Sequence, residues 1–207
     1  MKKHISYLLT VILLLLAVLS FASCGPDKMT LNDYYSAFTE TTNGTLSVKF
    51  SLTAEGTTVV SESIANIDSN KVKMEVKVSA AGQSQTTETY LEQDGSDTYV
   101  YVYANGKWTK SKITDENYDS AIETAEELEE LFNEEYYSYD ESTKKFSMNP
   151  GAAIDVDGIG TFSNVLIEQT DTEYKLTANV ETNGMLGSFE MLLNDIGNAS
   201  VTLPEVS

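Results

Sequence analysis

Residues 71–78 read KVKMEVKV, and every second side chain in this stretch is apolar. Residues 46–52 (LSVKFSL) and 174–180 (YKLTANV) repeat the same alternation. Successive side chains of a β-strand point to opposite faces, so this period of two predicts strands with one buried face and one face in water. Such strands are typical of antiparallel sheets.

Further segments have the composition of strands, and turn-forming residues separate most of them. The clearest turn is Asn105-Gly106, a dipeptide that favours a tight hairpin between the two segments beside it. The weaker strands are predicted at residues 58–67, 86–93, 96–104, 107–113, 144–148, 162–169, 187–194 and 199–203.

Two segments have helical spacing instead. Thr30 followed by Asp33 is typical of a helix N-cap with an acid at the third position, and predicts a helix over 30–42. Residues 118–132 carry an apolar stripe on an acidic background, and such a helix needs an apolar surface to dock on. We therefore expect an α+β fold: a large curved antiparallel sheet, an open half-barrel, with two helices packed on one face.

The composition excludes much of enzyme chemistry. The 207 residues include 13 basic residues, all of them lysine, 32 acidic residues and one histidine, His4, which lies in the predicted leader. Without histidine a mature chain cannot build a Ser-His-Asp or Cys-His site, and without arginine it has no bidentate phosphate clamp. The net charge of −19 disfavours nucleic acid. We expect a protein that is not an enzyme and has no cofactor.

The N-terminal residues have the pattern of an export signal. Lys2 and Lys3 precede an apolar run over 11–19, which is short for a membrane-spanning helix. Residues 21–25, FASCG, resemble the lipobox of bacterial lipoprotein signal peptides, although that family prefers leucine where this chain has phenylalanine. The resemblance implies that cleavage leaves Cys24 as an acylated first residue.

This interpretation divides the chain into residues 1–23 as a lipoprotein signal peptide, 24–29 as the acylated cysteine and a short tether, and 30–207 as a single domain. An ordinary signal peptide beside an unrelated cysteine is the alternative, but Cys24 is the only cysteine in the chain. Two or three acyl chains anchor a protein stably. The predicted location is therefore the extracytoplasmic face of the cell membrane, held by the lipid, and no protein partner follows from the sequence.

The order of these features resembles the LolA/LppX-like superfamily of exported lipid-binding lipoproteins. The resemblance rests on the lipobox, the short helix before the first long strand, the segment 94–108, the helical insertion at 118–132 and the final segment 196–204. It implies a half-barrel capped by helices, with a hydrophobic cavity that holds acyl chains. The predicted function is non-enzymatic binding of a lipid or other apolar ligand.

Apolar and aromatic side chains on these segments are the candidate lining of such a cavity. Methionine suits irregular ligands because it is flexible, but the same side chains also fill ordinary cores. The candidate ligand-binding residues are Phe50, Met74, Val76, Tyr101, Trp108, Leu128 and Phe132.

An aromatic hairpin suggests a different function. Tyr99, Tyr101 and Tyr103 alternate along one predicted strand, across the turn from Trp108. Such rings form platforms for sugars or protein partners, which makes an extracytoplasmic glycan- or protein-recognition module the alternative function. Cross-strand aromatic pairs also stabilise sheets by about 0.2–1 kcal/mol each, so a structural role competes with this hypothesis.

Acidic residues give two further hypotheses. A pair such as Glu127 and Glu130 has the chemistry of a glycosidase dyad, but close pairs are inevitable among 32 acids. Asp155 and Asp157, in one of several acidic turns, supply oxygens for weak calcium binding. None of these turns completes a twelve-residue calcium loop, and turn formation explains them more simply than calcium binding. The sequence therefore predicts no metal site.

Overall fold

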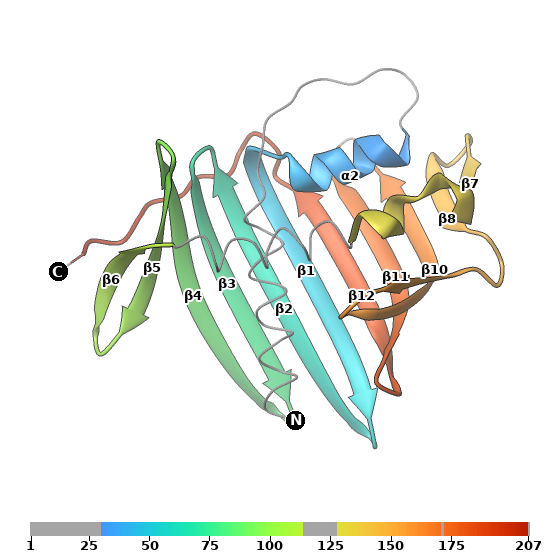
Figure 1. Ribbon diagram of the computed structural model, residues 1–207, viewed down its shortest axis with the longest axis horizontal. Helices are drawn as coiled ribbons and strands as arrows, with labels where there is room; N and C mark the ends of the chain where they lie inside the picture. The colour runs from blue at the N-terminus through green and yellow to red at the C-terminus, as the bar shows by residue number, and fades with distance from the viewer. Residues whose placement is uncertain (1–29, 114–127, 171, 207) are drawn as a thin grey trace.

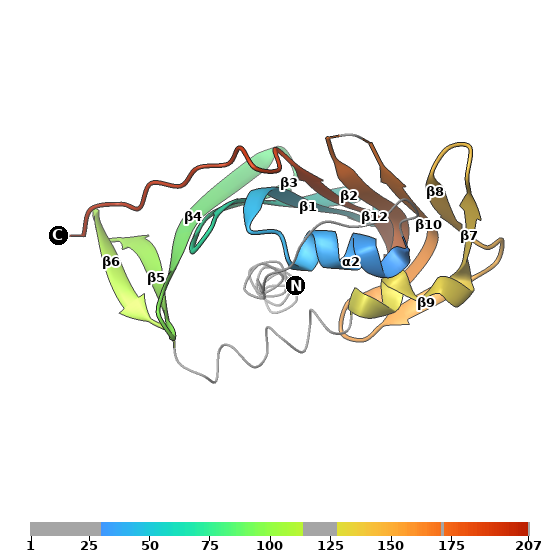
Figure 2. The same ribbon diagram turned by 90° about the horizontal axis from the view of Figure 1, so that it is seen from above.

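The structure is a computed structural model that describes residues 30–113, 128–170 and 172–206. One twelve-stranded antiparallel sheet dominates it, and Figures 1 and 2 show that this sheet is strongly curved. Its order is β6-β5-β4-β3-β2-β1-β12-β11-β10-β8-β7, and β9 pairs with β10. The strands are β1 (Asn43–Ala54), β2 (Thr57–Asp68), β3 (Lys71–Ala80), β4 (Gln83–Asp94), β5 (Asp97–Ala104), β6 (Lys107–Lys112), β7 (Tyr137–Asp140), β8 (Lys145–Met148), β9 (Ala153–Val156), β10 (Gly160–Gln169), β11 (Tyr174–Thr182) and β12 (Met185–Asn194).

The three alternating stretches lie in β1, β3 and β11, as predicted. The tight turn is also confirmed, because Asn105 and Gly106 both have positive φ angles, 54° and 83°. Two short strands, β7 and β9, were missed. The predicted strand at 199–203 is wrong: β12 ends at Asn194, and the chain continues as a tail without regular structure.

Helix α2 (Leu31–Thr39) begins as predicted, with Thr30 as its N-cap. The Asp33 amide donates to the Thr30 hydroxyl oxygen (3.3 Å), and the Thr30 amide donates to the Asp33 carboxylate (2.6 Å). The helix ends earlier than residue 42. Its apolar side packs on the sheet, where the Tyr34 ring meets the Tyr174 ring of β11 with centroids 5.7 Å apart.

The predicted α+β class with two helices packed on one face is wrong. The described residues form a nearly all-β protein in which α2 is the one α-helix with complete bounds. Of the predicted helix at 118–132, residues 118–127 lie outside the described part of the chain, and the described end turns into the 3-10 turn η1 (Glu130–Phe132). A curved sheet buries much of its inner face against itself, so it needs less helical cover than a flat sheet.

The main core lies on the concave side of the sheet. The Phe189 ring of β12 stands 4.7 Å from the Phe50 ring and 5.4 Å from the Phe162 ring, measured between centroids, and all three side chains are buried. A second, smaller cluster lies on the convex side. Its members are Tyr90, Tyr101 and Val201, with Tyr99, Trp108 and Leu203 packed against them.

The C-terminal tail, residues 195–206, covers part of the convex face. Figure 2 shows it running along the outer side of the curved sheet. The Asn43 side chain binds both backbone groups of Ala199, because its amide donates to the Ala199 carbonyl and its oxygen accepts from the Ala199 amide, each at 2.9 Å. Further along, the Val201 amide donates to the Asp68 carboxylate at 3.1 Å. The tail is therefore fastened across β1 and β2.

Candidate functional site

The concave face of β1, β2 and β3 carries an apolar strip that two serines interrupt. Strand register places Ser61 beside both Phe50 and Val78, and Ser63 beside both Val48 and Val76. We call these six residues the concave strip: Val48, Phe50, Ser61, Ser63, Val76 and Val78. All except Val78 are buried.

Helix α2 packs at one end of this concave side. It lies over the end of the sheet where β1 begins, next to β12 and β11 (Figures 1 and 2). Phe38 of α2 contacts Tyr174 of β11 and Phe132 of η1, with ring centroids 6.4 and 6.3 Å apart. Toward the turn between β1 and β2, both strands continue beyond this helix (Figure 1).

The two serines of the concave strip have an unusual environment. Each is only 1% exposed, and neither hydroxyl oxygen has a hydrogen-bond partner. Leaving a buried polar group unsatisfied costs about 1–3 kcal/mol, so most such groups in proteins are paired. Neither Ser61 nor Ser63 is among the binding residues that the sequence predicted. The available signal was that they interrupt a series of small and apolar residues at alternate positions of β2.

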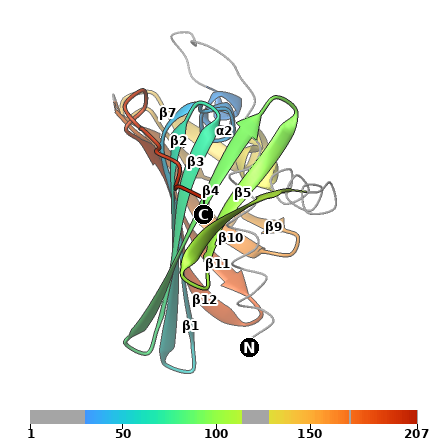
Figure 3. The same cartoon turned by 90° about the vertical axis from the view of Figure 1, so that its left-hand side faces the viewer.

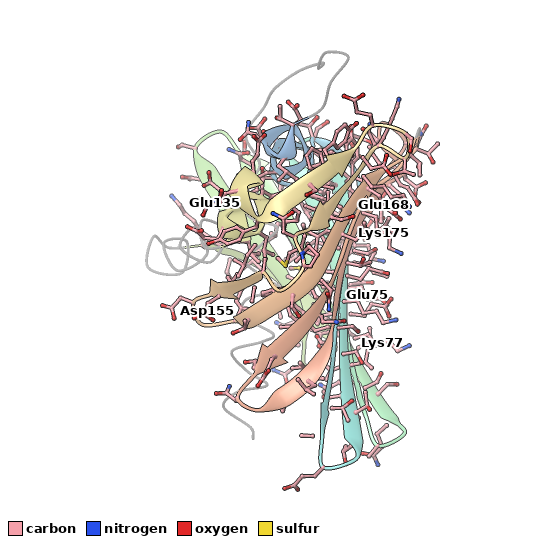
Figure 4. All side chains as sticks on the ribbon, turned by 90° about the vertical axis from the view of Figure 1, so that its right-hand side faces the viewer. Glu75, Lys77, Glu135, Asp155, Glu168 and Lys175 are labelled. Carbon is pink, nitrogen blue, oxygen red and sulfur yellow. The ribbon has the colours of Figure 1, made fainter. Side chains whose placement is uncertain are left out.

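The concave side of β1 to β4 carries no charged residue, whereas the convex side carries many. Lys73 pairs with Glu88 at 2.8 Å, and Lys175 pairs with Glu190 at 2.9 Å, both from neighbouring strands. Figure 4 shows Glu75 and Lys77, with Glu168 and Lys175, projecting from the side of the sheet away from α2. Hydrogen bonds from Lys73 and Tyr90 lower the pKa of the Glu88 carboxyl. The convex face is thus a network of ions, and the concave face is neutral.

The predicted ligand-binding residues divide between these two faces. Phe50, Met74 and Val76 lie on the concave face, and Leu128 and Phe132 belong to the same core beside α2. Tyr101 and Trp108 lie on the convex face, in the second cluster. The structure therefore brings five of the seven residues into one core and separates the other two from it. Cys24 lies outside the described residues.

The aromatic hairpin of β5 and β6 is mostly shielded. Tyr101 is 4% exposed, and its hydroxyl donates to the Glu92 carboxylate at 2.5 Å. The ammonium group of Lys110 lies 4.2 Å from the centre of the Tyr99 ring and 2.7 Å from Glu92. Figure 3 shows this hairpin at the edge of the sheet. Tyr103, at 57% exposed, is the ring of this hairpin that stands out into solvent.

A surface pocket of about 300 Å³ lies between α2 and η1, and it is open to solvent. Carboxylate and amide side chains outnumber the two rings that border it. It lies beside the helix and not over the concave strip, so it is not the apolar cavity that the sequence predicted. Its lining residues are Asn32, Tyr35, Glu129, Glu130, Phe132 and Asn133.

The acidic turns make hydrogen bonds within the protein. Asp157 accepts from the Gly158 amide at 2.9 Å, and Asp155 accepts from the Thr161 hydroxyl at 3.2 Å. Within the described ranges, no three acidic, cysteine or histidine side chains gather as a metal site would require. In the same part of the chain, no helix has the length and apolar character needed to cross a membrane.

Comparisons with known proteins yield little. No family model matches the chain, and no curated protein matches it. Among solved structures, a porin-like protein from Bacteroides uniformis ATCC 8492 is similar, with 10% sequence identity and a TM-score of 0.25. The match covers 74% of this chain and 96% of the other. A score of this size does not identify a shared fold.

Proposed function

We propose that the protein is a lipid-anchored, extracytoplasmic binding protein that holds a lipid or other apolar ligand against the concave face of its sheet. The observation that carries the proposal is the concave strip, which is apolar, uncharged and interrupted only by two serine hydroxyls without hydrogen-bond partners. Burial of apolar surface contributes about 25 cal/mol per Å², so a hydrocarbon chain laid along such a strip binds without any charged contact. We propose no catalytic step and no cofactor.

The chemistry available on this face supports binding over catalysis. Its side-chain polar groups on β1 to β3 are serine and threonine hydroxyls, and strand register places no base beside Ser61 or Ser63 to activate a nucleophile. The only histidine of the chain belongs to the predicted leader. A neutral apolar surface without a proton acceptor suits a molecule that is carried or stored and not transformed.

The proposed anchor is Cys24. Feeding cells with labelled palmitate should label the chain, and Cys24→Ser should abolish both the label and membrane attachment. Ser23→Ala, which keeps a small residue before the cysteine, is the matched control and should keep both. A chain that stays unlabelled and still sediments with membranes would contradict this part of the proposal.

Ligand binding is tested separately from anchoring. Native mass spectrometry of the chain released from membranes should show an apolar molecule that co-purifies with it. Val76→Ser on the concave face should reduce that occupancy, whereas Lys77→Ser, one residue further along β3 on the other face, should not. Equal occupancy in both variants, or a protein that never carries a ligand, would contradict the proposal.

The alternative function, glycan or protein recognition by the aromatic hairpin, depends on exposed rings. The burial of Tyr101 and the packing of Tyr99 and Trp108 against the cluster of Tyr90, Tyr101 and Val201 leave Tyr103 as its one strongly exposed ring. A platform for a sugar needs a flat ring surface open to solvent. The geometry therefore favours the concave face.

A further inference from the structure

We propose that the concave face selects a neutral amphipathic molecule, whose uncharged hydrogen-bonding group, such as an ester or a hydroxyl, binds at Ser61 and Ser63. Because the serines and their neighbours are buried, the ligand has to enter between the sheet and the side chains that cover it, and its hydrocarbon part then packs on the apolar side chains around these serines. This inference rests on the proposed function and adds the chemical class of the ligand.

Two buried hydroxyl groups on β2 have no hydrogen-bond partner. Ser61 and Ser63 both lie on β2 and point to the same face, because residues two apart in a strand share a face. Neither oxygen has a hydrogen-bond partner, although each residue is 99% buried. Two unsatisfied hydroxyls on one strand lower the stability of the folded state. A ligand that accepts from or donates to both of them removes that cost.

The side chains around these serines are apolar. Val48 and Val76 flank Ser63, and Phe50 flanks Ser61. The strip continues into the rings of Phe189 and Phe162 on β12 and β10. Such a surface suits a hydrocarbon chain that runs across the strands, with one polar group on it near the middle.

The concave side of these strands also lacks charged side chains. No residue on the concave side of β1, β2, β3 or β4 is charged, so a carboxylate, phosphate or ammonium group has no partner in these four strands. Moving an unpaired charge into apolar surroundings is far more costly than moving a neutral polar group. Thr87 and Thr89 of β4 face the same side, beside Val76 and Met74, and extend the neutral hydrogen-bonding surface. The face therefore discriminates against charged ligands.

The test compares three probes that share an eighteen-carbon chain: monoolein, which is neutral and carries an ester and hydroxyls; oleate, which is an anion; and 1-octadecene, which has no polar group. Radiolabelled probes are equilibrated with the full chain on beads, below their aggregation concentrations. We expect monoolein to bind about tenfold or more tightly than 1-octadecene, since two hydrogen bonds of ordinary strength supply that ratio. It should also bind about tenfold or more tightly than oleate, because the unpaired charge of oleate is costly to bury.

The decisive variant is Ser61→Ala combined with Ser63→Ala. It should lower monoolein affinity to that of 1-octadecene and leave 1-octadecene binding unchanged. The midpoint of urea unfolding should stay the same or rise, because the change removes unsatisfied buried groups. Each single variant, Ser61→Ala or Ser63→Ala, should weaken monoolein binding about threefold, so the test survives if the double variant folds poorly.

The matched control is Ser47→Ala with Ser51→Ala, two serines of β1 that face the convex side. It should leave all three affinities unchanged. A monoolein preference that survives in the double variant, or oleate binding as tight as monoolein binding, would overturn the inference while the proposed function stands. If none of the three probes binds the parent chain, the proposed function itself fails.

Discussion

The two faces of the same strands are organised by different forces. Along β3, Met74 and Val76 point to the concave side, where they are buried, and Lys73 and Lys77 point to the convex side. On the concave face, burial of apolar side chains makes a large contribution to stability. An unpaired charge in these surroundings would be costly. The convex face is held by ion pairs between neighbouring strands, each of which contributes little. One alternating sequence thus encodes a packing surface and a solvated surface independently.

If burial stabilises the concave face and weaker ion pairs the convex face, substitutions on the concave face should lower stability the most. Phe189→Ala removes a ring that packs between Phe50 and Phe162, and should lower the free energy of unfolding by about 3–5 kcal/mol. Leu186→Ala, on the same strand but 65% exposed, should change it by less than about 0.5 kcal/mol. Urea unfolding measures both, and similar losses in the two variants would show that burial on the concave face does not dominate the stability.

The next effect is confined to alkaline solution and again comes from the concave side. Burial, followed by the nearby Tyr139, Tyr174 and Glu168, raises the pKa of Tyr34 from 10 to about 12. The folded state then keeps a proton that the unfolded state loses, so this contribution to stability is complete below pH 10 and is lost as the pH rises to 12.

Tyr34→Phe removes this titrating group, and should make the alkaline fall in stability shallower between pH 10 and 12. Unfolding midpoints measured at intervals of half a pH unit would show it. Tyr103→Phe, at the exposed ring of the convex hairpin, is the control. A parent and a Tyr34→Phe variant with identical alkaline profiles would contradict the expectation.

The C-terminal tail is an exception on the convex face, because it buries apolar surface there. Val201→Ala should cost about 1–2 kcal/mol and loosen the cluster that contains Trp108, the only tryptophan of the chain. The fluorescence of Trp108 should shift to longer wavelength as water reaches its ring. Val206→Ala, further along the tail and 51% exposed, should leave the emission unchanged. Unshifted emission in Val201→Ala would show that the tail does not shield the cluster.

The smallest effect is expected from the ion pairs. Lys73→Ala, which breaks the pair with Glu88, should change the free energy of unfolding by less than about 1 kcal/mol, since both side chains are about one-third exposed. The difference should shrink further in 1 M salt, which screens exposed charges. Met74→Ala, the neighbouring residue on the concave face, is the comparison and should cost several times more. Equal losses in the free energy of unfolding for Lys73→Ala and Met74→Ala would show that the ion pairs stabilise the fold as much as the buried core does.

The sequence predicted those features of the fold that depend on local pattern. The alternation in residues 71–78, the capping residues Thr30 and Asp33, and the turn at Asn105 each act over a few positions, and each is observed. The fold class failed because it depends on how much of the sheet needs helical cover. The sequence predicted a curved sheet, but the degree of curvature, and with it the helical cover that the sheet needs, arises from the twist of many strands together.

The candidate site shows the same limit. Phe50, Met74 and Val76 share a face because strand register aligns them, and their apolar character pointed to the core. Tyr101 and Trp108 were placed with them because they are aromatic, but the turn before each strand determines which of its two faces points inward. For Val201 the error was of another kind. Its segment was predicted to be a strand, but the residue is buried in a tail that forms no strand.

The pairing of β1 with β12 has a consequence for how the molecule assembles. These strands lie side by side in the middle of the sheet, yet they come from opposite ends of the described chain. Contacts between segments so distant in sequence require closure of a very large loop, which slows folding. A nascent chain lacking residues 185–194 would present two open strand edges, on β1 and on β11. Cooperative folding must therefore wait for the last strand, and truncation there should yield an aggregating fragment and not a smaller domain.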